Sequence, residues 1–145
     1  MLQAQEFDQK VALEAVLYLA EKSIAPTFHH IAKLLYFADR LHLERYGRLI
    51  CGDRYVAMKN GPVPSGVYDM LKAARDGMQY LHFPEAEEAF DVVGTYTVQA
   101  LRGPDLGWLS ASELECLDEA LHLYDGYSFK QLTRLSHDAA WHAAD

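Results

Sequence analysis

Histidines and carboxylates are the residues of this 145-residue chain that could do chemistry, and the chain has seven histidines and 21 acidic residues. His29 and His30 are adjacent, and adjacent side chains on a helix point about 100° apart, so they are poorly placed to hold one metal ion. Asp39 and His42 are three positions apart and could orient an imidazole for acid–base catalysis. On an amphipathic helix such a pair more often makes a solvated or interhelical polar contact. We therefore favour a structural role for Asp39 and His42.

Common enzyme and cofactor motifs are absent from the sequence. There is no Gly-x-Ser-x-Gly, P-loop, dinucleotide fingerprint or His-Glu-x-x-His pattern. Cys51 and Cys116 lie far apart with no Cys-x-x-Cys spacing, which predicts reduced thiols instead of a disulfide or a zinc site. We predict no catalytic residues, no metal and no cofactor.

Aromatic side chains are the second group that could carry a function, through contacts with another protein. His137 and Trp141 are four apart and share a face if that segment is helical. The structural interpretation makes Trp141 an anchor for the C-terminus and His137 a cap or a buried hydrogen-bonding group; the alternative is a contact surface. Further aromatic residues flank residues 60–64, and we expect most to be core: Tyr36, Phe37, Tyr46, Tyr55 and Tyr68.

The segment Asn60-Gly61-Pro62-Val63-Pro64 predicts a stiff change of chain direction. Its two prolines fix two φ angles and remove two amide donors, while Asn60 and Gly61 tolerate positive φ. We expect a rigid corner between an extended segment and a helix.

The elements that position these residues are mainly helical. Capping residues and apolar spacing predict five helices, with Thr27, Ser110 and Ser128 as N-caps and Gly47 and Gly77 as C-caps. The predicted helices are Asp8–Lys22, Phe28–Tyr46, Pro64–Asp76, Ser110–Asp125 and Ser128–Ser136. Leu49–Lys59 should be extended or a small hairpin, and Phe90–Gly94 and Thr95–Leu101 two short strands. We predict a mainly α (α+β) fold, a compact bundle of about five helices with a small antiparallel β element, in one domain spanning residues 1–145 with residues 1–7 as an N-terminal tail.

The net charge of −8 disfavours a general nucleic-acid binder, because phosphates attract Lys and Arg. The charges are unevenly distributed: residues 33–75 hold eight basic and four acidic residues, and residues 76–145 hold three basic and thirteen acidic ones. We expect a basic face and an acidic face. The N-terminus lacks a signal-peptide pattern and no apolar run is long enough to span a bilayer, so we expect a cytoplasmic protein without a membrane partner.

Several short motifs occur together in one order: Lys33-Leu34-Leu35-Tyr36-Phe37-Ala38-Asp39, Tyr46-Gly47, Gly52-Asp53-Arg54-Tyr55-Val56-Ala57, Asn60-Gly61-Pro62-Val63-Pro64, and Leu135-Ser136-His137 before Trp141. In this order and spacing the chain resembles the Panacea domain, and more closely its SocA-like antitoxins, over about residues 10–142. The resemblance implies a helical antitoxin that neutralises a cognate toxin protein by direct contact. For the SocA-like branch it also implies a proteolytic adapter that tethers the toxin to the ClpXP protease.

The resemblance implies no catalytic residues. It maps the family motif onto ten positions of this chain: Lys33, Tyr36, Asp39, Gly52, Tyr55, Ala57, Gly61, Pro62, His137 and Trp141. Counting charges adds Arg48, Arg54 and Lys59 as a basic partner-binding face, and Asn60 belongs to the adjoining turn.

Two other classes of function stay open at this point. A winged-helix-like surface with Arg40, Arg45, Arg48 and Arg54 would make the chain a DNA-binding transcriptional regulator, against which the net charge argues. An enzyme would use Asp39, His42 or His137.

Overall fold

The computed structural model describes residues 5–77 and 83–137. Its first two elements are the helices α1 (Gln9–Lys22) and α2 (Phe28–Tyr46). The Asp8 side chain caps α1 by accepting from the Val11 amide, and Thr27 caps α2 by accepting from the His30 amide. Gly47 ends α2 in the left-handed conformation, at φ 77°. Both helices confirm the predicted bounds to within one residue.

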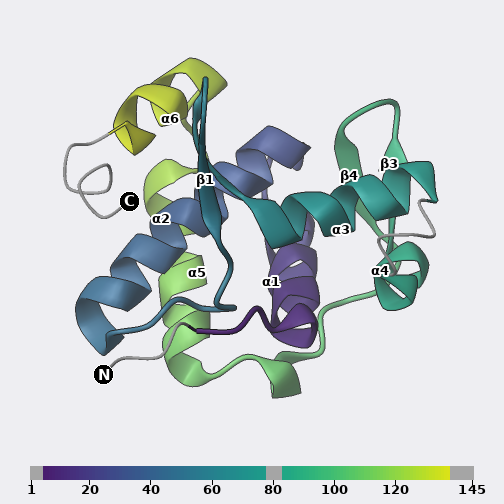
Figure 1. Ribbon diagram of the computed structural model, residues 1–145, viewed down its shortest axis with the longest axis horizontal. Coiled ribbons are helices and arrows are strands. Elements are labelled where there is room, and N and C mark those ends of the chain that lie inside the picture. The colour runs from purple at the N-terminus through teal and green to yellow at the C-terminus, as the bar shows by residue number, and fades with distance from the viewer. Residues whose placement is uncertain (1–4, 78–82, 138–145) are drawn as a thin grey trace.

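Helix α2 runs through the middle of the molecule (Figure 1) and contacts α1, α3, α5 and α6. Every residue from His30 to Asp39 is buried. The helix is thus covered on all sides over this stretch, whereas an amphipathic surface helix buries one stripe. Its polar residues in this stretch are consequently enclosed by protein.

After α2 the chain forms a hairpin of β1 (Tyr55–Met58) and β2 (Gly61–Pro64), paired antiparallel with Tyr55 opposite Pro64 and Met58 opposite Gly61. The predicted corner over Asn60 to Pro64 is therefore wrong in part, because Gly61–Pro64 is itself a strand. Prolines are tolerated in a strand where the missing amide donor points away from its partner. Strand β2 is largely buried, whereas Val56, Ala57 and Met58 of β1 are exposed.

The second half of the chain surrounds α2. Helix α3 (Ser65–Asp76) follows the hairpin directly, and Gly77 is its C-cap residue. The sequence analysis did not predict the helix α4 (Pro84–Ala89) or the short 3₁₀ helix η1 (Leu106–Trp108). The strands β3 (Phe90–Val93) and β4 (Thr97–Ala100) pair antiparallel, as predicted. Helices α5 (Ala111–Tyr124) and α6 (Phe129–Ser136) each begin with a complete capping box, on Ser110 and Ser128.

The fold is mainly α, with six helices and two small antiparallel strand pairs in the described residues. This confirms the predicted class with one helix more than expected. Cys51 and Cys116 are buried and unpaired. Within residues 5–77 and 83–137, no helix is both long and apolar enough to cross a membrane.

Candidate partner-binding site

Lys33 is a buried cation in the N-terminal half of α2, with only 3 % of its surface exposed. Its Nζ donates to the Asn60 carbonyl at 2.5 Å and to the Ser136 hydroxyl at 3.1 Å. Both acceptors are neutral. Burial lowers the pKa of Lys33 to about 8, because desolvation disfavours the charged form.

Gly61 at the hairpin turn packs directly on this ammonium group. Its φ is +104°, and a Cβ built there would lie 2.7 Å from both Lys33 Nζ and Ser136 Oγ. A side chain at this position would be strained and would also crowd the lysine. Glycine therefore lets the hairpin close over Lys33 and the end of α6.

Beside Lys33, the hairpin, α2 and α3 enclose a pocket of about 150 Å³. Its described walls are largely apolar, and within residues 5–77 and 83–137 no acidic residue lines it. The lining residues are His29, Ala32, Lys33, Met58, Lys59, Asn60, Pro62, Val63 and Tyr68. The pocket is a small apolar recess with a buried cation in its wall.

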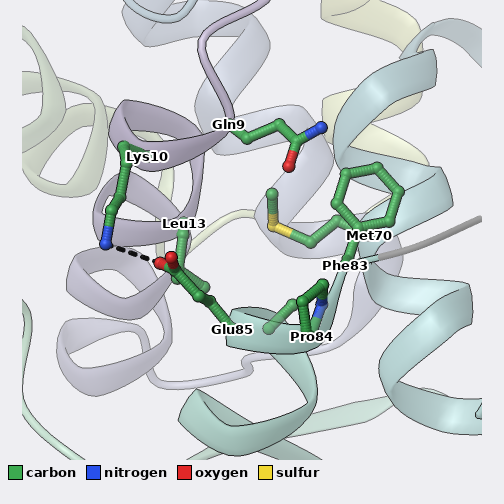
Figure 2. Close-up of a pocket in the computed structure, with 8 residues that line it drawn as sticks. Gln9, Lys10, Leu13, Met70, Phe83, Pro84 and Glu85 are labelled. Atoms are coloured by element: carbon green, nitrogen blue, oxygen red, sulfur yellow. Dashed lines mark hydrogen bonds and ion pairs between the residues drawn. The ribbon is translucent and has the colours of Figure 1, made fainter.

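A second pocket, of about 230 Å³, lies between α1, α3 and α4 and has a different electrostatic character. Figure 2 shows an ion pair in its wall, between Lys10 Nζ and Glu85 Oε2 at 2.6 Å. Because Glu85 neutralises Lys10, the described lining of this pocket offers a partner no unpaired cation. The hairpin pocket is the stronger candidate for recognition.

Asp39, Tyr55 and their neighbours form a separate buried cluster that holds the hairpin to α2. Asp39 is fully buried, and its carboxylate accepts from the Ile50 amide and the Tyr55 hydroxyl, both at 2.7 Å. Burial raises the pKa of Asp39 to about 7, although both hydrogen bonds act in the opposite direction. This contact is architectural.

Asp53 has a similar structural role at the start of α3. It accepts from the Gly66 amide at 2.8 Å and the Val67 amide at 2.9 Å, and so satisfies two backbone donors that the helix leaves unpaired. The preceding Gly52 has φ +68°, and a Cβ on it would lie 2.2 Å from the Glu6 carbonyl oxygen. Gly52 and Asp53 thus fix the entry into the hairpin.

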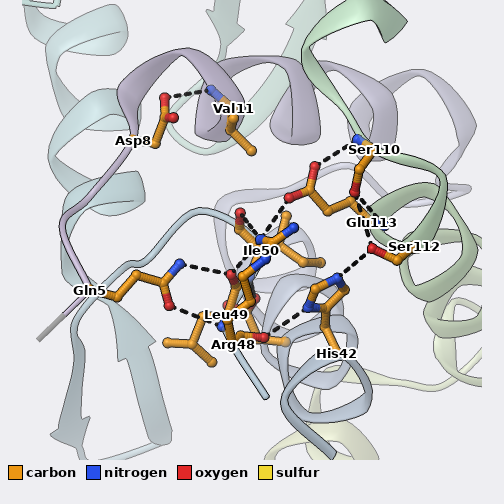
Figure 3. A network of polar contacts seen from close by, with 11 residues as sticks. Gln5, Asp8, Val11, His42, Arg48, Leu49, Ile50, Ser110, Ser112 and Glu113 are labelled. Atoms are coloured by element: carbon orange, nitrogen blue, oxygen red, sulfur yellow. Dashed lines mark hydrogen bonds and ion pairs between the residues drawn. The ribbon is translucent and has the colours of Figure 1, made fainter. Parts of the chain in front are cut away.

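Arg48 and His42 belong to a polar network between the end of α2 and the start of α5 (Figure 3). Arg48 donates to Glu113 at 2.8 Å, while the His42 ring is hydrogen-bonded to the Arg48 carbonyl at 2.8 Å and to the Ser112 hydroxyl at 2.9 Å. His42 and Asp39 therefore have different partners and do not form the catalytic pair that their spacing allowed. The interhelical contact expected for His42 is confirmed.

The predicted basic and acidic faces are partly paired with each other. Arg45 forms ion pairs with Glu115 at 3.2 Å and with Glu119 at 2.6 Å, and Arg48 pairs with Glu113. Helix α2 packs on α5, so the basic and the acidic stretch meet at that interface instead of lying on opposite sides. These pairs also weaken the winged-helix hypothesis, since two of its four arginines already contact carboxylates.

Residues 31–142 match the family described as antitoxin SocA-like, Panacea domain, which is well over half of the chain. The chain belongs to this SocA-like antitoxin family. Comparison with curated proteins and with solved structures finds no match. The antitoxin match includes most of α2, the hairpin and α6, but begins after α1, whose buried residues complete the core.

The structure separates the predicted site residues of this chain into groups. Lys33, Lys59, Asn60, Gly61 and Pro62 lie together at the hairpin pocket. The His137 ring lies 3.5 Å from where a Cβ of Gly61 would be, and His137 is the C-cap residue of α6, as one interpretation expected.

The remaining predicted residues lie elsewhere. Tyr36 is buried, Asp39 and Tyr55 bond to each other, Arg48 joins the α5 network, and Arg54 is exposed. Trp141 lies outside the described residues, so its predicted anchoring role stays a prediction. The sequence analysis did not select Ser136 or Met58 as site residues. Ser136 is next to the predicted His137, but its contact with Lys33 joins α6 to α2, two helices that are far apart in the sequence.

Proposed function

We propose that this chain is an antitoxin that binds and neutralises a cognate toxin protein in the cytoplasm, and that it acts without catalysis. The family match carries this proposal. The exposed strand β1 supports direct contact, since Val56 is 40 % and Met58 57 % exposed beside the pocket. Apolar side chains at the edge of a pocket are typical of protein-binding surfaces.

The proposal is tested by expressing the neighbouring open reading frame alone and together with this chain. We expect that product to stop growth alone, to be tolerated when this chain is present, and to co-purify with it. Met58→Asp should weaken the complex, because a charge on β1 would have to be desolvated in the interface. Ile24→Asp is the matched control: Ile24 is 78 % exposed, precedes α2 and is not among the residues that line the hairpin pocket. A neighbouring product that is harmless, or that this chain does not bind, would contradict the proposal.

A finer part of the proposal is that the antitoxin delivers the toxin to the ClpXP protease. An adapter needs a second surface for the protease. In Figure 1 the hairpin tip lies near the upper edge, and the chain between β4 and α5, which contains η1, runs along the lower edge. Leu106 and Trp108 of η1 are 49 % and 45 % exposed. We assign the hairpin to the toxin and η1 to the protease.

The adapter role predicts a short toxin half-life that depends on both this chain and ClpX. Trp108→Asp should lengthen that half-life without weakening toxin binding, and Met58→Asp should weaken binding itself. A half-life that is the same with and without ClpX would remove the adapter role and leave neutralisation by binding intact.

A further inference from the structure

The Lys33 ammonium is buried without a counter-charge. Its two hydrogen-bond partners, the Asn60 carbonyl and the Ser136 hydroxyl, are neutral, and within residues 5–77 and 83–137 no carboxylate forms an ion pair with it. Burying a charged group without an opposite charge beside it carries a large desolvation penalty. The described residues of the free protein thus contain no carboxylate that neutralises the Lys33 ammonium.

Among the described residues, the other groups that line the pocket supply no negative charge. Burial, and next the charge of Lys33, lower the pKa of His29 on α2, which favours the neutral form of its ring. A hydrogen bond of 3.0 Å joins its Nδ1 to the hydroxyl of Tyr68 on α3. Lys59 stands at the rim on the hairpin turn, and His137 follows α6. The recess is electropositive although the chain carries a net charge of −8.

The size of the pocket limits what can enter it. Its volume is about 150 Å³, which is smaller than the roughly 300–1,000 Å³ of small-molecule sites and equals about five water molecules at ~30 Å³ each. One protein side chain is a suitable occupant. Met58, Pro62 and Val63 supply apolar contact for its methylene groups, and Lys33 supplies the charge.

Building on the proposed function, we infer that this pocket binds an aspartate or glutamate side chain of the toxin, whose carboxylate pairs with the Lys33 ammonium. Binding would then supply the counter-charge that the free antitoxin lacks. Lys59 at the rim would attract the same carboxylate and affect mainly the association rate.

The test compares wild type with Lys33→Met for binding to the co-purified product of the neighbouring gene, by titration calorimetry at pH 7.5, 8.5 and 9.5. Loss of one partner of a buried charge pair should weaken binding by about 30-fold or more. Wild-type affinity should fall by about 20-fold from pH 7.5 to 9.5 as Lys33 loses its proton, relative to a variant that cannot titrate. Lys10→Met is the control, because Lys10 already pairs with Glu85.

Each outcome decides the inference. Equal binding by Lys33→Met and wild type, with the same pH profile, overturns the inference while toxin binding stands. If wild type binds no toxin, the proposed function fails and the inference falls with it. If Lys33→Met does not fold, the wild-type pH profile decides alone, and an affinity unchanged up to pH 9.5 overturns the inference.

A carboxylate of the chain itself is the competing occupant, and Asp138 is the nearest in sequence to Ser136 and His137. The pKa of Lys33 in the free protein can be followed through its ¹³Cε resonance. If Asp138→Asn lowers that pKa and leaves toxin binding unchanged, the counter-charge is internal and the inference is wrong. We expect Asp138→Asn to change neither quantity.

Discussion

Lys33→Met should change how the stability of this protein depends on pH. Lys33 has a pKa of about 8 in the folded protein, against an ordinary value of 10.5. Between these values the unfolded chain binds more protons than the folded one, so the free energy of unfolding rises with pH. The charged lysine therefore destabilises the fold at pH 7, and this penalty disappears as the pH passes 8 and approaches 10.5. Methionine has a similar length and does not titrate.

The magnitude follows from the two pKa values. At ~1.4 kcal/mol per pKa unit, the contribution of Lys33 to the free energy of unfolding changes by roughly 2 kcal/mol between pH 7 and pH 10. The lost hydrogen bonds to Asn60 and Ser136 offset the gain from removing the charge by about 1 kcal/mol each. That offset depends little on pH. The prediction therefore concerns only how the difference in unfolding free energy between wild type and Lys33→Met changes with pH.

The assay is urea unfolding of both proteins at pH 7, 8, 9 and 10. We expect wild type to gain roughly 2 kcal/mol relative to Lys33→Met across this range. Lys59→Met is the control, since Lys59 is exposed and should show no such trend. A difference between wild type and Lys33→Met that stays constant from pH 7 to 10 would refute the assignment of Lys33 as a buried, destabilised cation.

Three further substitutions test the architecture around the hairpin. Tyr55→Phe removes a hydrogen bond to Asp39 and should lower the free energy of unfolding by about 1.5–3 kcal/mol at pH 8. At pH 5, below the Asp39 pKa of about 7, the loss measured by urea unfolding should be smaller. An equal loss at both pH values would contradict the raised pKa of Asp39. Gly52→Ala should cost clearly more than Gly47→Ala, because both residues have positive φ but only Gly52 has a backbone oxygen, at 2.2 Å, where the Cβ would lie; equal melting temperatures would be inconsistent with this close approach. Asp53→Ala should lower the free energy of unfolding by about 1–2 kcal/mol through loss of the α3 cap, with reduced amide protection at Gly66 and Val67; unchanged protection there would argue against capping.

Local sequence signals predicted most helices of this fold because their causes are local. The capping boxes at Ser110 and Ser128 and the glycine after α2 act within a few residues of the helix ends that they define. Helix α4 was missed because its six residues are too few to show a helical apolar period. The β2 strand was read as a corner because its two prolines are turn formers, and only the pairing with β1 shows that their missing donors are tolerated there.

The candidate site likewise combines residues that the sequence predicts with contacts that only the tertiary structure shows. The sequence by itself determined the family, the helical class and the residues around Lys33 and Gly61 that belong together as a motif. It could not show that the ammonium of Lys33, the carbonyl of Asn60 and the hydroxyl of Ser136 meet, because these groups come from α2, the hairpin and α6. Nor could it show that Asp39 is buried against Ile50 and Tyr55, or that Arg48 pairs with Glu113 of α5, because each of these contacts forms only when the elements pack together. Burial and charge pairing depend on what lies across an interface, and only the tertiary structure decides that.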